Sequence, residues 1–294
     1  MQQTKMKYKL ILEGPDGAGK STLAKSIGKT WHHGYYEDAK EMFCEVAKSI
    51  LSECQVIDRC HYSEIVYSGI HRNEKQRLGS KVRMLDRLIL SKKYIVVKCL
   101  PDYEICYKAW SSGREEMVKD EVKFKKIYQS YSNLEINTPH VVYDWTKDSI
   151  KTLEVKISNL NLYDNKGPGI GNFKPGNILL VGDKTNDKDF GGIDIPFVSW
   201  SGCSPWLSDQ LDKSSISESE LYFVNCITTS NELTSANFID ILKPRLVIAL
   251  GEHAAKWCEL NKVQHERISH PQYWKRFNSK KIYPLIDILK KAIA

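Results

Sequence analysis

The segment from Gly14 to Ser21 constrains this chain more than any other part of its sequence. It fits the pattern G-x-x-x-x-G-K-[ST] in full, and it stands between an apolar run at Tyr8–Leu12 and a helical pattern that begins at Lys20. Glycines let successive backbone N–H groups turn toward one anion, and the following helix directs the positive end of its dipole at the same point. The sequence therefore predicts a phosphate-binding loop between a buried strand and a helix.

This loop predicts a binding site for ATP and Mg²⁺. Lys20 would place a full positive charge at the β- and γ-phosphates, and the Ser21 hydroxyl would be a ligand of the metal ion. The residues expected to hold the nucleotide are consecutive: Gly14, Pro15, Asp16, Gly17, Ala18, Gly19, Lys20, Ser21 and Thr22.

The rest of the chain divides into two patterned halves, residues 1–158 and 177–294. Residues 159–176 are rich in Gly, Pro and Asn, which is typical of a linker. Both halves alternate apolar, strand-like runs with helical segments, and this alternation predicts the fold class α/β with a parallel sheet in each half. The expected strands are Tyr8–Leu12, Gln55–Ile57, Tyr94–Leu100, Val141–Tyr143, Ile178–Val181, Leu221–Val224 and Leu246–Leu250. The expected helices are Lys119–Leu134, Pro205–Lys213, Ser235–Leu242, Glu252–Leu260 and Pro284–Ile293.

Three segments of the first half resemble thymidylate kinases and their deoxynucleotide-kinase relatives. The loop reads EGPDGAGKST, where that family shows E-G-x-D-G-x-G-K-[ST]-T. Asp58–Ser63, followed by Tyr67, is similar to the family's D-R-Y-x-x-S-x-x-A-Y. Residues 98–116 resemble its strand, proline turn and arginine-bearing lid, with Arg114 in the lid. The resemblance covers residues 7–155 and implies a P-loop kinase domain, in a family where homodimers are common.

The resemblance also implies roles for single residues. Asp58 would hold Mg²⁺ through water or accept the proton of the acceptor hydroxyl. Arg59 would clamp an acceptor phosphate in fork geometry, and Asp16 would hydrogen-bond a sugar hydroxyl. Arg114 would neutralise charge on the transferred phosphoryl group, or it is a surface arginine of the loop. Lys108 stands where the family lid carries a further arginine, and this departure concerns the identity of the acceptor.

Residues 177–294 resemble the uracil-DNA glycosylase superfamily through five motifs in the family's order. The matching segments are residues 178–186, Ile195–Val198 with Ser201-Gly202, Leu221–Asn225, Lys243–Gly251 with Ala254, and Ser269–Gln272. The resemblance implies a second α/β domain that recognises a DNA base. Asp183 stands in a loop without the Pro-Gly that shapes the family's water-activating loop. This loss favours a recognition module without glycosylase chemistry.

Several residues of this second half are candidates for DNA contact. Asn225 would read a pyrimidine edge or close a turn, and His270 would stabilise a departing base or be structural. After His270, aromatic and cationic residues alternate, which suits base stacking beside a phosphate track. The alternative is a packed loop whose aromatic rings belong to the core. The DNA-binding candidates are Asn225, His270, Tyr273, Trp274, Lys275 and Arg276.

Charge and composition add two expectations. The net charge is +7, and the stretches His71–Lys93 and Lys262–Ala294 each hold eight basic and two acidic residues. These stretches fit a polyanionic partner or are solvated helix faces. No run of about 18 apolar residues predicts a membrane span, and the N-terminus lacks the pattern of a signal peptide. We therefore expect no membrane partner and a cytoplasmic location, which is the host cytoplasm if the protein is phage-encoded.

The two resemblances together predict a kinase domain joined to a base-recognition domain, as in the phage 5-hydroxymethyluracil DNA kinases of the thymidylate kinase family. Such an enzyme would use ATP to phosphorylate the hydroxymethyl group of a thymidine-like base in DNA, a step in phage DNA hypermodification. One alternative is a deoxynucleoside monophosphate kinase that acts on free dTMP or hydroxymethyl-dUMP. The others are a DNA glycosylase with a regulatory ATPase domain and a DNA-binding ATPase without an acceptor.

Overall fold

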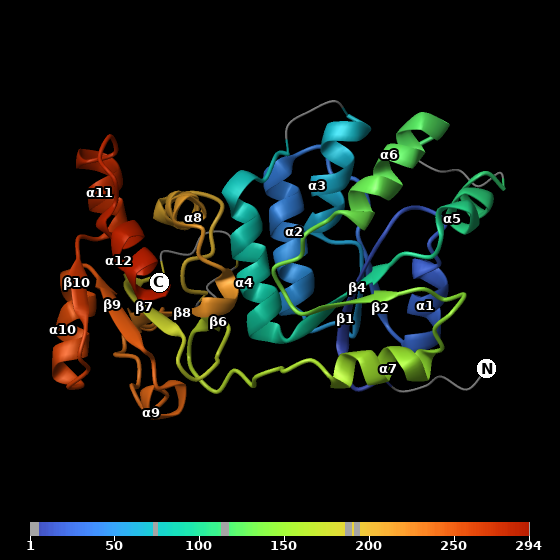
Figure 1. Cartoon of the computed structure of the whole chain (residues 1–294). Helices are drawn as coiled ribbons and strands as arrows, with labels where there is room; N and C mark the ends of the chain where they lie inside the picture. Colours follow the sequence, from blue (N-terminus) through green and yellow to red (C-terminus); the bar gives the residue numbers. More distant parts are fainter. Residues whose placement is uncertain (1–5, 73–75, 113–117, 186–189, 191–194, 294) are drawn as a thin grey trace. The chain divides into compact units, whose positions relative to one another are not determined.

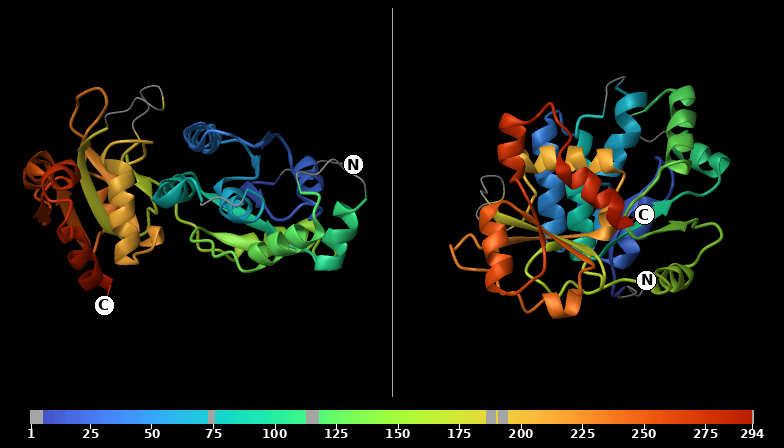
Figure 2. Two further views of the ribbon diagram at one scale, coloured as in Figure 1. Left: turned by 90° about the horizontal axis from the view of Figure 1, so that it is seen from above. Right: turned by 60° about the vertical axis from the view of Figure 1, so that its left-hand side comes forward.

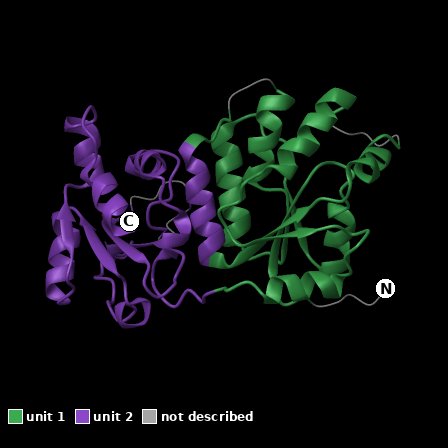
Figure 3. Cartoon of the chain, viewed as in Figure 1, with its two compact units in different colours: residues 1–79, 92–162 green, residues 80–91, 163–294 purple. Residues whose placement is uncertain are grey.

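The computed structural model describes residues 6–72, 76–112, 118–185, 190 and 195–293. The chain forms two compact units (Figure 3). Unit 1 comprises residues 1–79 and 92–162, and unit 2 comprises residues 80–91 and 163–294. Each unit contains its own five-stranded sheet. Over the described ranges, no helix is both long and apolar enough to cross a membrane.

Unit 1 is built on a wholly parallel sheet with the strand order β2-β3-β1-β4-β5 (Figure 1). Its strands are β1 (Lys9–Glu13), β2 (Thr30–His32), β3 (Val56–Asp58), β4 (Tyr94–Cys99) and β5 (His140–Tyr143). Its helices are α1 (Lys20–Ile27), α2 (Ala39–Leu51), α3 (His61–Ile70), α5 (Tyr103–Trp110), α6 (Glu121–Ser132) and α7 (Ile150–Ser158). The central strands β1 and β4 are mostly apolar and buried, as expected of strands with both faces covered. Leu10 and Leu12 of β1, for example, pack in one cluster with Leu23 and Ile27 of α1.

The second sheet has the order β10-β9-β7-β8-β6, with β6 antiparallel to its neighbour β8 and the remaining pairs parallel. Its strands are β6 (Ile170–Gly171), β7 (Ile178–Lys184), β8 (Leu221–Ile227), β9 (Leu246–Leu250) and β10 (Glu266–Ile268). The helices of unit 2 are α4 (Val82–Lys92, all but its last residue), α8 (Cys203–Ser214), α9 (Ile239–Leu242), α10 (Glu252–Leu260), α11 (Pro271–Phe277) and α12 (Pro284–Ile293). Trp257 of α10 packs in one cluster with Leu179 and Val181 of β7. Figure 2 shows α8 and α10 on opposite sides of these strands.

The predicted α/β class is confirmed. Helices α2, α3, α4, α5 and α7 were not among the predicted elements. The short strands β2, β6 and β10 were not predicted. Helix α9 begins at Ile239 rather than Ser235. Residues 271–277 form helix α11 where a loop was predicted, because the His270 side chain caps the helix and Pro271 occupies its first turn.

Helix α4 differs from the predicted domain division, which placed residues 80–91 in the first half. Arg87 of α4 is fully buried, and its guanidinium donates to both carboxylate oxygens of Glu218 at 3.0 and 2.9 Å. Its Nη1 donates to the Phe197 carbonyl oxygen at 2.8 Å, and the group lies 3.7 Å from the centre of the Phe223 ring. A buried guanidinium requires a matched counter-charge. Because Glu218 supplies it, α4 belongs to unit 2.

Candidate active site

The loop from Gly14 to Lys20 has the backbone that its glycines predict. Gly14, Gly17 and Gly19 have φ values of 147°, 76° and 84°. A Cβ atom on Gly14 would lie 2.2 Å from the Cys99 carbonyl oxygen, and one on Gly17 would lie 2.4 Å from the Cys106 carbonyl oxygen. Only glycine fits at these two positions, because the ends of β4 and α5 approach the loop so closely.

Lys20 lies within this loop rather than in solvent. It is buried, and its Nζ donates to the carbonyl oxygens of Gly14 at 2.9 Å and Pro15 at 2.7 Å. Burial, with the positive charge of Arg59, lowers the pKa of Lys20. An ammonium group in this position favours a strong anion beside it, and a nucleotide phosphate is such an anion.

Asp58 ends β3 and is paired in register with Leu12, so its carboxylate lies at the same sheet edge as the loop. One carboxylate oxygen lies 3.2 Å from Nδ1 of His32. The other, Oδ1, is buried and has no hydrogen-bond partner among the described residues. A buried oxygen of this kind fits a ligand site, and carboxylate and hydroxyl oxygens suit Mg²⁺. Asp58 and the exposed Ser21 at the start of α1 would hold the ion with ATP.

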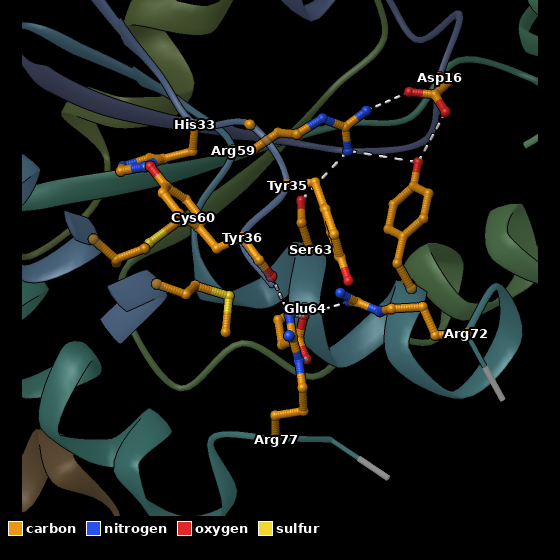
Figure 4. Close-up of a pocket in the computed structure, with 14 residues that line it drawn as sticks. Asp16, His33, Tyr35, Tyr36, Arg59, Cys60, Ser63, Glu64, Arg72 and Arg77 are labelled. Atoms are coloured by element: carbon orange, nitrogen blue, oxygen red, sulfur yellow. Dashed lines mark hydrogen bonds and ion pairs between the residues drawn. The ribbon is translucent and has the colours of Figure 1, made fainter. Parts of the chain in front are cut away.

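Arg59, Asp16 and Tyr67 form one connected group. Arg59 has a left-handed backbone with φ 70°, and its Nη2 makes an ion pair with Asp16. Its Nη1 donates to Tyr67 Oη at 3.5 Å, and that hydroxyl donates to Asp16 Oδ2 at 3.1 Å (Figure 4). The sequence predicted separate roles for Arg59 and Asp16, whereas the structure joins the two side chains.

Glu13, whose role was not predicted, links β1 to α3. Its carboxylate is fully buried and accepts from the Cys60 N–H and the Ser63 hydroxyl, both at 2.7 Å. Burial raises the pKa of Glu13. These bonds fix the start of α3, the helix that carries Tyr67, beside the loop.

A cavity of about 340 Å³ opens next to the Arg59 group. Asp16, Arg59 and Tyr67 line it together with His33 and Tyr36 (Figure 4). Its volume falls within the range of small-ligand pockets, roughly 300–1,000 Å³. Asp16 thus belongs both to the phosphate-binding loop and to the wall of the cavity.

Two arginines from the basic stretch His71–Lys93 also line this cavity. Glu64 is buried and pairs with Arg72 and with Arg77, the latter at 2.8 Å. The stretch was predicted to face a polyanionic partner or to form solvated helix faces, but these arginines and Arg87 make internal ion pairs. Their partners cannot be identified from local sequence. The predicted lid residue Arg114 lies outside the described residues.

A second cavity, of about 470 Å³, lies in unit 2. It brings together Asn225, His270 and Arg276, three of the predicted DNA-binding residues, with Asp183 and Phe197. Asp183 Oδ1 is buried without a hydrogen-bond partner in the described chain, and Asp183 Oδ2 lies 3.9 Å from His270 Nε2. Burial lowers the pKa of His270.

Phe197 lines this cavity and has an unusual backbone conformation. It has φ 56°, which is rare for a bulky residue. A Cβ atom on Gly182 would lie 2.3 Å from the Phe197 ring and 2.8 Å from Asn225 Oδ1. Gly182 therefore leaves the space in which the aromatic ring and the amide meet.

The other predicted DNA-binding residues do not line the second cavity. The ring of Trp274 packs against Tyr283 with 5.7 Å between ring centres, and Lys275 Nζ donates to the Gly202 carbonyl oxygen at 2.9 Å. Tyr273 is 53% exposed and lies beside Phe277, which is 70% exposed.

No protein-family model matches this sequence, and no curated protein does. Similar solved structures include the YorR protein from Bacillus subtilis in complex with phosphorylated GDP, at 23% identity and a TM-score of 0.42, over 51% of this chain and 92% of that one. Deoxyadenosine kinase from M. mycoides with bound dCTP is similar at 18% identity and a TM-score of 0.34, over 52% of this chain and 98% of that one. The same kinase with bound dATP gives 16% identity and a TM-score of 0.33, over 52% and 99% of the two chains.

Proposed function

We propose that this protein is an ATP-dependent phosphotransferase for a deoxynucleotide-like acceptor, and that this acceptor is the hydroxymethyl group of 5-hydroxymethyluracil in DNA. The observation that carries the proposal is the position of Asp16. Its backbone is part of the phosphate-binding loop, while its carboxylate lines the neighbouring cavity with Arg59. A donor phosphate on the loop and an acceptor in the cavity would therefore meet at this residue.

The chemistry proposed here is a direct transfer. The acceptor hydroxyl oxygen forms a bond to the γ-phosphorus of ATP while the bond from that phosphorus to the ADP oxygen breaks. Lys20 and Arg59 stabilise the negative charge of the phosphates. Mg²⁺, held at Ser21 and Asp58, would further neutralise that charge. Among the described residues Asp58 Oδ1 has no hydrogen-bond partner, so this oxygen could take the acceptor's proton if Asp58 does not hold Mg²⁺ through water.

The second cavity supports an acceptor within DNA. Phe197 offers an aromatic face, Asn225 an amide and Arg276 a cation around one space of about 470 Å³. These groups suit contact with another base of the same DNA, while the base to be phosphorylated would occupy the first cavity. A kinase that modifies bases in a polymer must expose its target, whereas a kinase for free nucleotides has no need of such a domain.

A second candidate is a kinase for free dTMP or hydroxymethyl-dUMP. The first cavity favours it, because the described residues that line that cavity all belong to unit 1 and Arg59 could clamp a terminal phosphate. A further alternative is a DNA glycosylase with a regulatory ATPase domain. Such an enzyme would release free base from DNA.

One labelling experiment separates these functions. The protein is incubated with γ-labelled ATP and either a 5-hydroxymethyluracil duplex, an unmodified duplex, dTMP or hydroxymethyl-dUMP. We expect label in the 5-hydroxymethyluracil duplex and none in the unmodified duplex. Label on free monophosphates only would support the second candidate. ATP hydrolysis with no labelled acceptor would contradict the phosphotransferase, and release of unlabelled base would indicate a glycosylase.

A further inference from the structure

A chain of hydrogen bonds stands behind one wall of the first cavity. His33, which follows β2, lies with Nδ1 3.0 Å from the Tyr36 hydroxyl and Nε2 2.8 Å from Ser49 Oγ on α2. His33 and Ser49 are buried, and Tyr36 lines the cavity. Asp16 and Tyr36 both line this cavity, and Figure 4 shows His33 and Asp16 on opposite sides of the close-up.

The direction of these bonds follows from counting protons. Ser49 Oγ donates its single hydrogen to the Val46 carbonyl oxygen at 2.8 Å, so it can only accept from His33 Nε2. His33 is buried and its two ring nitrogens face hydroxyl groups rather than a carboxylate, which favours the neutral ring with one N–H. With that hydrogen on Nε2, Nδ1 accepts, and the Tyr36 hydroxyl donates its single hydrogen to His33.

We propose that the Tyr36 hydroxyl oxygen acts only as a hydrogen-bond acceptor in the cavity and selects a base that presents an N–H there. This inference rests on the proposed function and names the part of the acceptor that is recognised. The reacting hydroxymethyl group must face the loop at Asp16, away from Tyr36. The N–H left on a uracil-type base in DNA is N3–H, so we assign the contact to that group.

The backbone around Tyr36 is held in place, which makes the selection strict. Arg77 donates to the carbonyl oxygens of Tyr36 at 3.0 Å and Glu37 at 2.6 Å, while Glu64 accepts from the same guanidinium at 2.8 Å. A fixed acceptor that meets a ligand without a donor leaves its oxygen without that hydrogen bond. Sites built in this way discriminate strongly against the analogue that lacks the hydrogen.

The test compares 5-hydroxymethyluracil acceptors with their N3-methylated forms. Wild-type protein should prefer the N–H form by about 10- to 100-fold in kcat/KM. In Tyr36→Phe the preference should fall close to one, with a raised KM for the acceptor and an unchanged KM for ATP. Ser49→Ala, which lies behind the wall, should weaken the preference by freeing the His33 proton to move to Nδ1. Tyr35→Phe, next in the chain, should keep the wild-type preference.

A binding measurement separates this inference from the proposed function. Thymidine and N3-methylthymidine are titrated by calorimetry into wild type and Tyr36→Phe without ATP, and thermal melting checks that each variant is folded. A binding preference for thymidine that Tyr36→Phe removes would support the inference even if no acceptor is phosphorylated. Equal binding of both nucleosides by wild type, or a preference retained in Tyr36→Phe, would overturn it.

Discussion

Lys20 is the residue most important for the proposed phosphate binding. Its ammonium group is buried and hydrogen-bonded to two neutral carbonyl oxygens of its own loop. Those bonds hold the loop closed around a positive charge, and burial lowers the pKa of the group. A bound phosphate would supply the negative charge that the carbonyl oxygens lack. The buried ammonium group should therefore bind an anion strongly.

Replacing Lys20 should therefore abolish transfer whatever the acceptor is. We expect Lys20→Ala to lower the transfer rate by roughly 100-fold or more, the scale seen when one charge-stabilising donor is removed. Lys25→Ala is the matched control, because Lys25 is exposed on the same helix. The measurement is label transferred from γ-labelled ATP. A Lys20→Ala protein with normal transfer would show that the loop does not hold the reacting phosphate.

Local motifs predicted the loop correctly, but not the contacts among distant residues. The strand before Gly14 and the helix from Lys20 were predicted, and the positive φ values of Gly14, Gly17 and Gly19 agree with a glycine loop between them. The ion pair between Asp16 and Arg59 joins residues 43 positions apart. His33 and Tyr36, which line the first cavity, follow the three-residue strand β2. That strand is too short to show a hydrophobic periodicity. Such pairs depend on how the strands are ordered in the sheet, which no local pattern specifies.

At the scale of elements, helix α11 places its aromatic side chains in different environments, although the sequence suggested one common role for them. Tyr273 and Phe277 are four positions apart, share one helix face and are exposed. Trp274 instead packs on Tyr283, and its indole N–H donates to the Lys281 carbonyl oxygen at 3.4 Å. The two predicted alternatives, stacking on bases and packing in the protein, thus apply to different side chains of one helix.

We expect substitutions in α11 to separate into two effects. Arg276→Ala should weaken binding to duplex DNA and reduce the slope of log K against log salt by about one, because one phosphate contact is lost. Tyr273→Ala should weaken DNA binding with little change in the salt slope. Trp274→Ala should mainly lower the melting temperature. Lys166→Ala, an exposed lysine of unit 2 outside the basic stretch, is the control. Unchanged DNA affinity in both Arg276→Ala and Tyr273→Ala would remove α11 from the proposed interface.

Strand and helix positions in unit 2 were predictable where apolar patterns are long. Strand β9 and helices α10 and α12 have the predicted bounds. Helix α11 was not predicted, because its cap is a histidine, which is not among the residues that usually begin helices. The sequence pattern therefore located the buried elements better than the exposed helix.

At the scale of the whole molecule, the chain passes between the two units three times rather than once. Residues 80–91 belong to unit 2, while the residues on either side of them belong to unit 1. The buried Arg87–Glu218 pair joins this segment to the rest of unit 2, and the same guanidinium holds the carbonyl group of Phe197. Long-range ion pairs, rather than linker composition, therefore decide where the units divide.

This division predicts that the two sequence-defined halves do not fold independently. A fragment of residues 1–158 leaves the Arg87 guanidinium without Glu218, and a fragment of residues 159–294 leaves the Glu218 carboxylate without Arg87. In the full chain, Arg87→Met should lower the free energy of unfolding by about 3–5 kcal/mol, the usual cost of leaving one member of a buried pair uncompensated. Arg245→Ala, which breaks a half-exposed pair with Glu220, should cost only about 0–1 kcal/mol.

Urea denaturation of the full-length variants, and circular dichroism of the separate and mixed fragments, measure these effects. Fragment 159–294 should lack a cooperative unfolding transition. Adding residues 80–91 back as a peptide should restore part of the structure, since the peptide supplies Arg87 with its helix. A fragment 159–294 that unfolds as cooperatively as the full chain would show that α4 is dispensable. In that case the Arg87–Glu218 ion pair would not be required for the folding of unit 2.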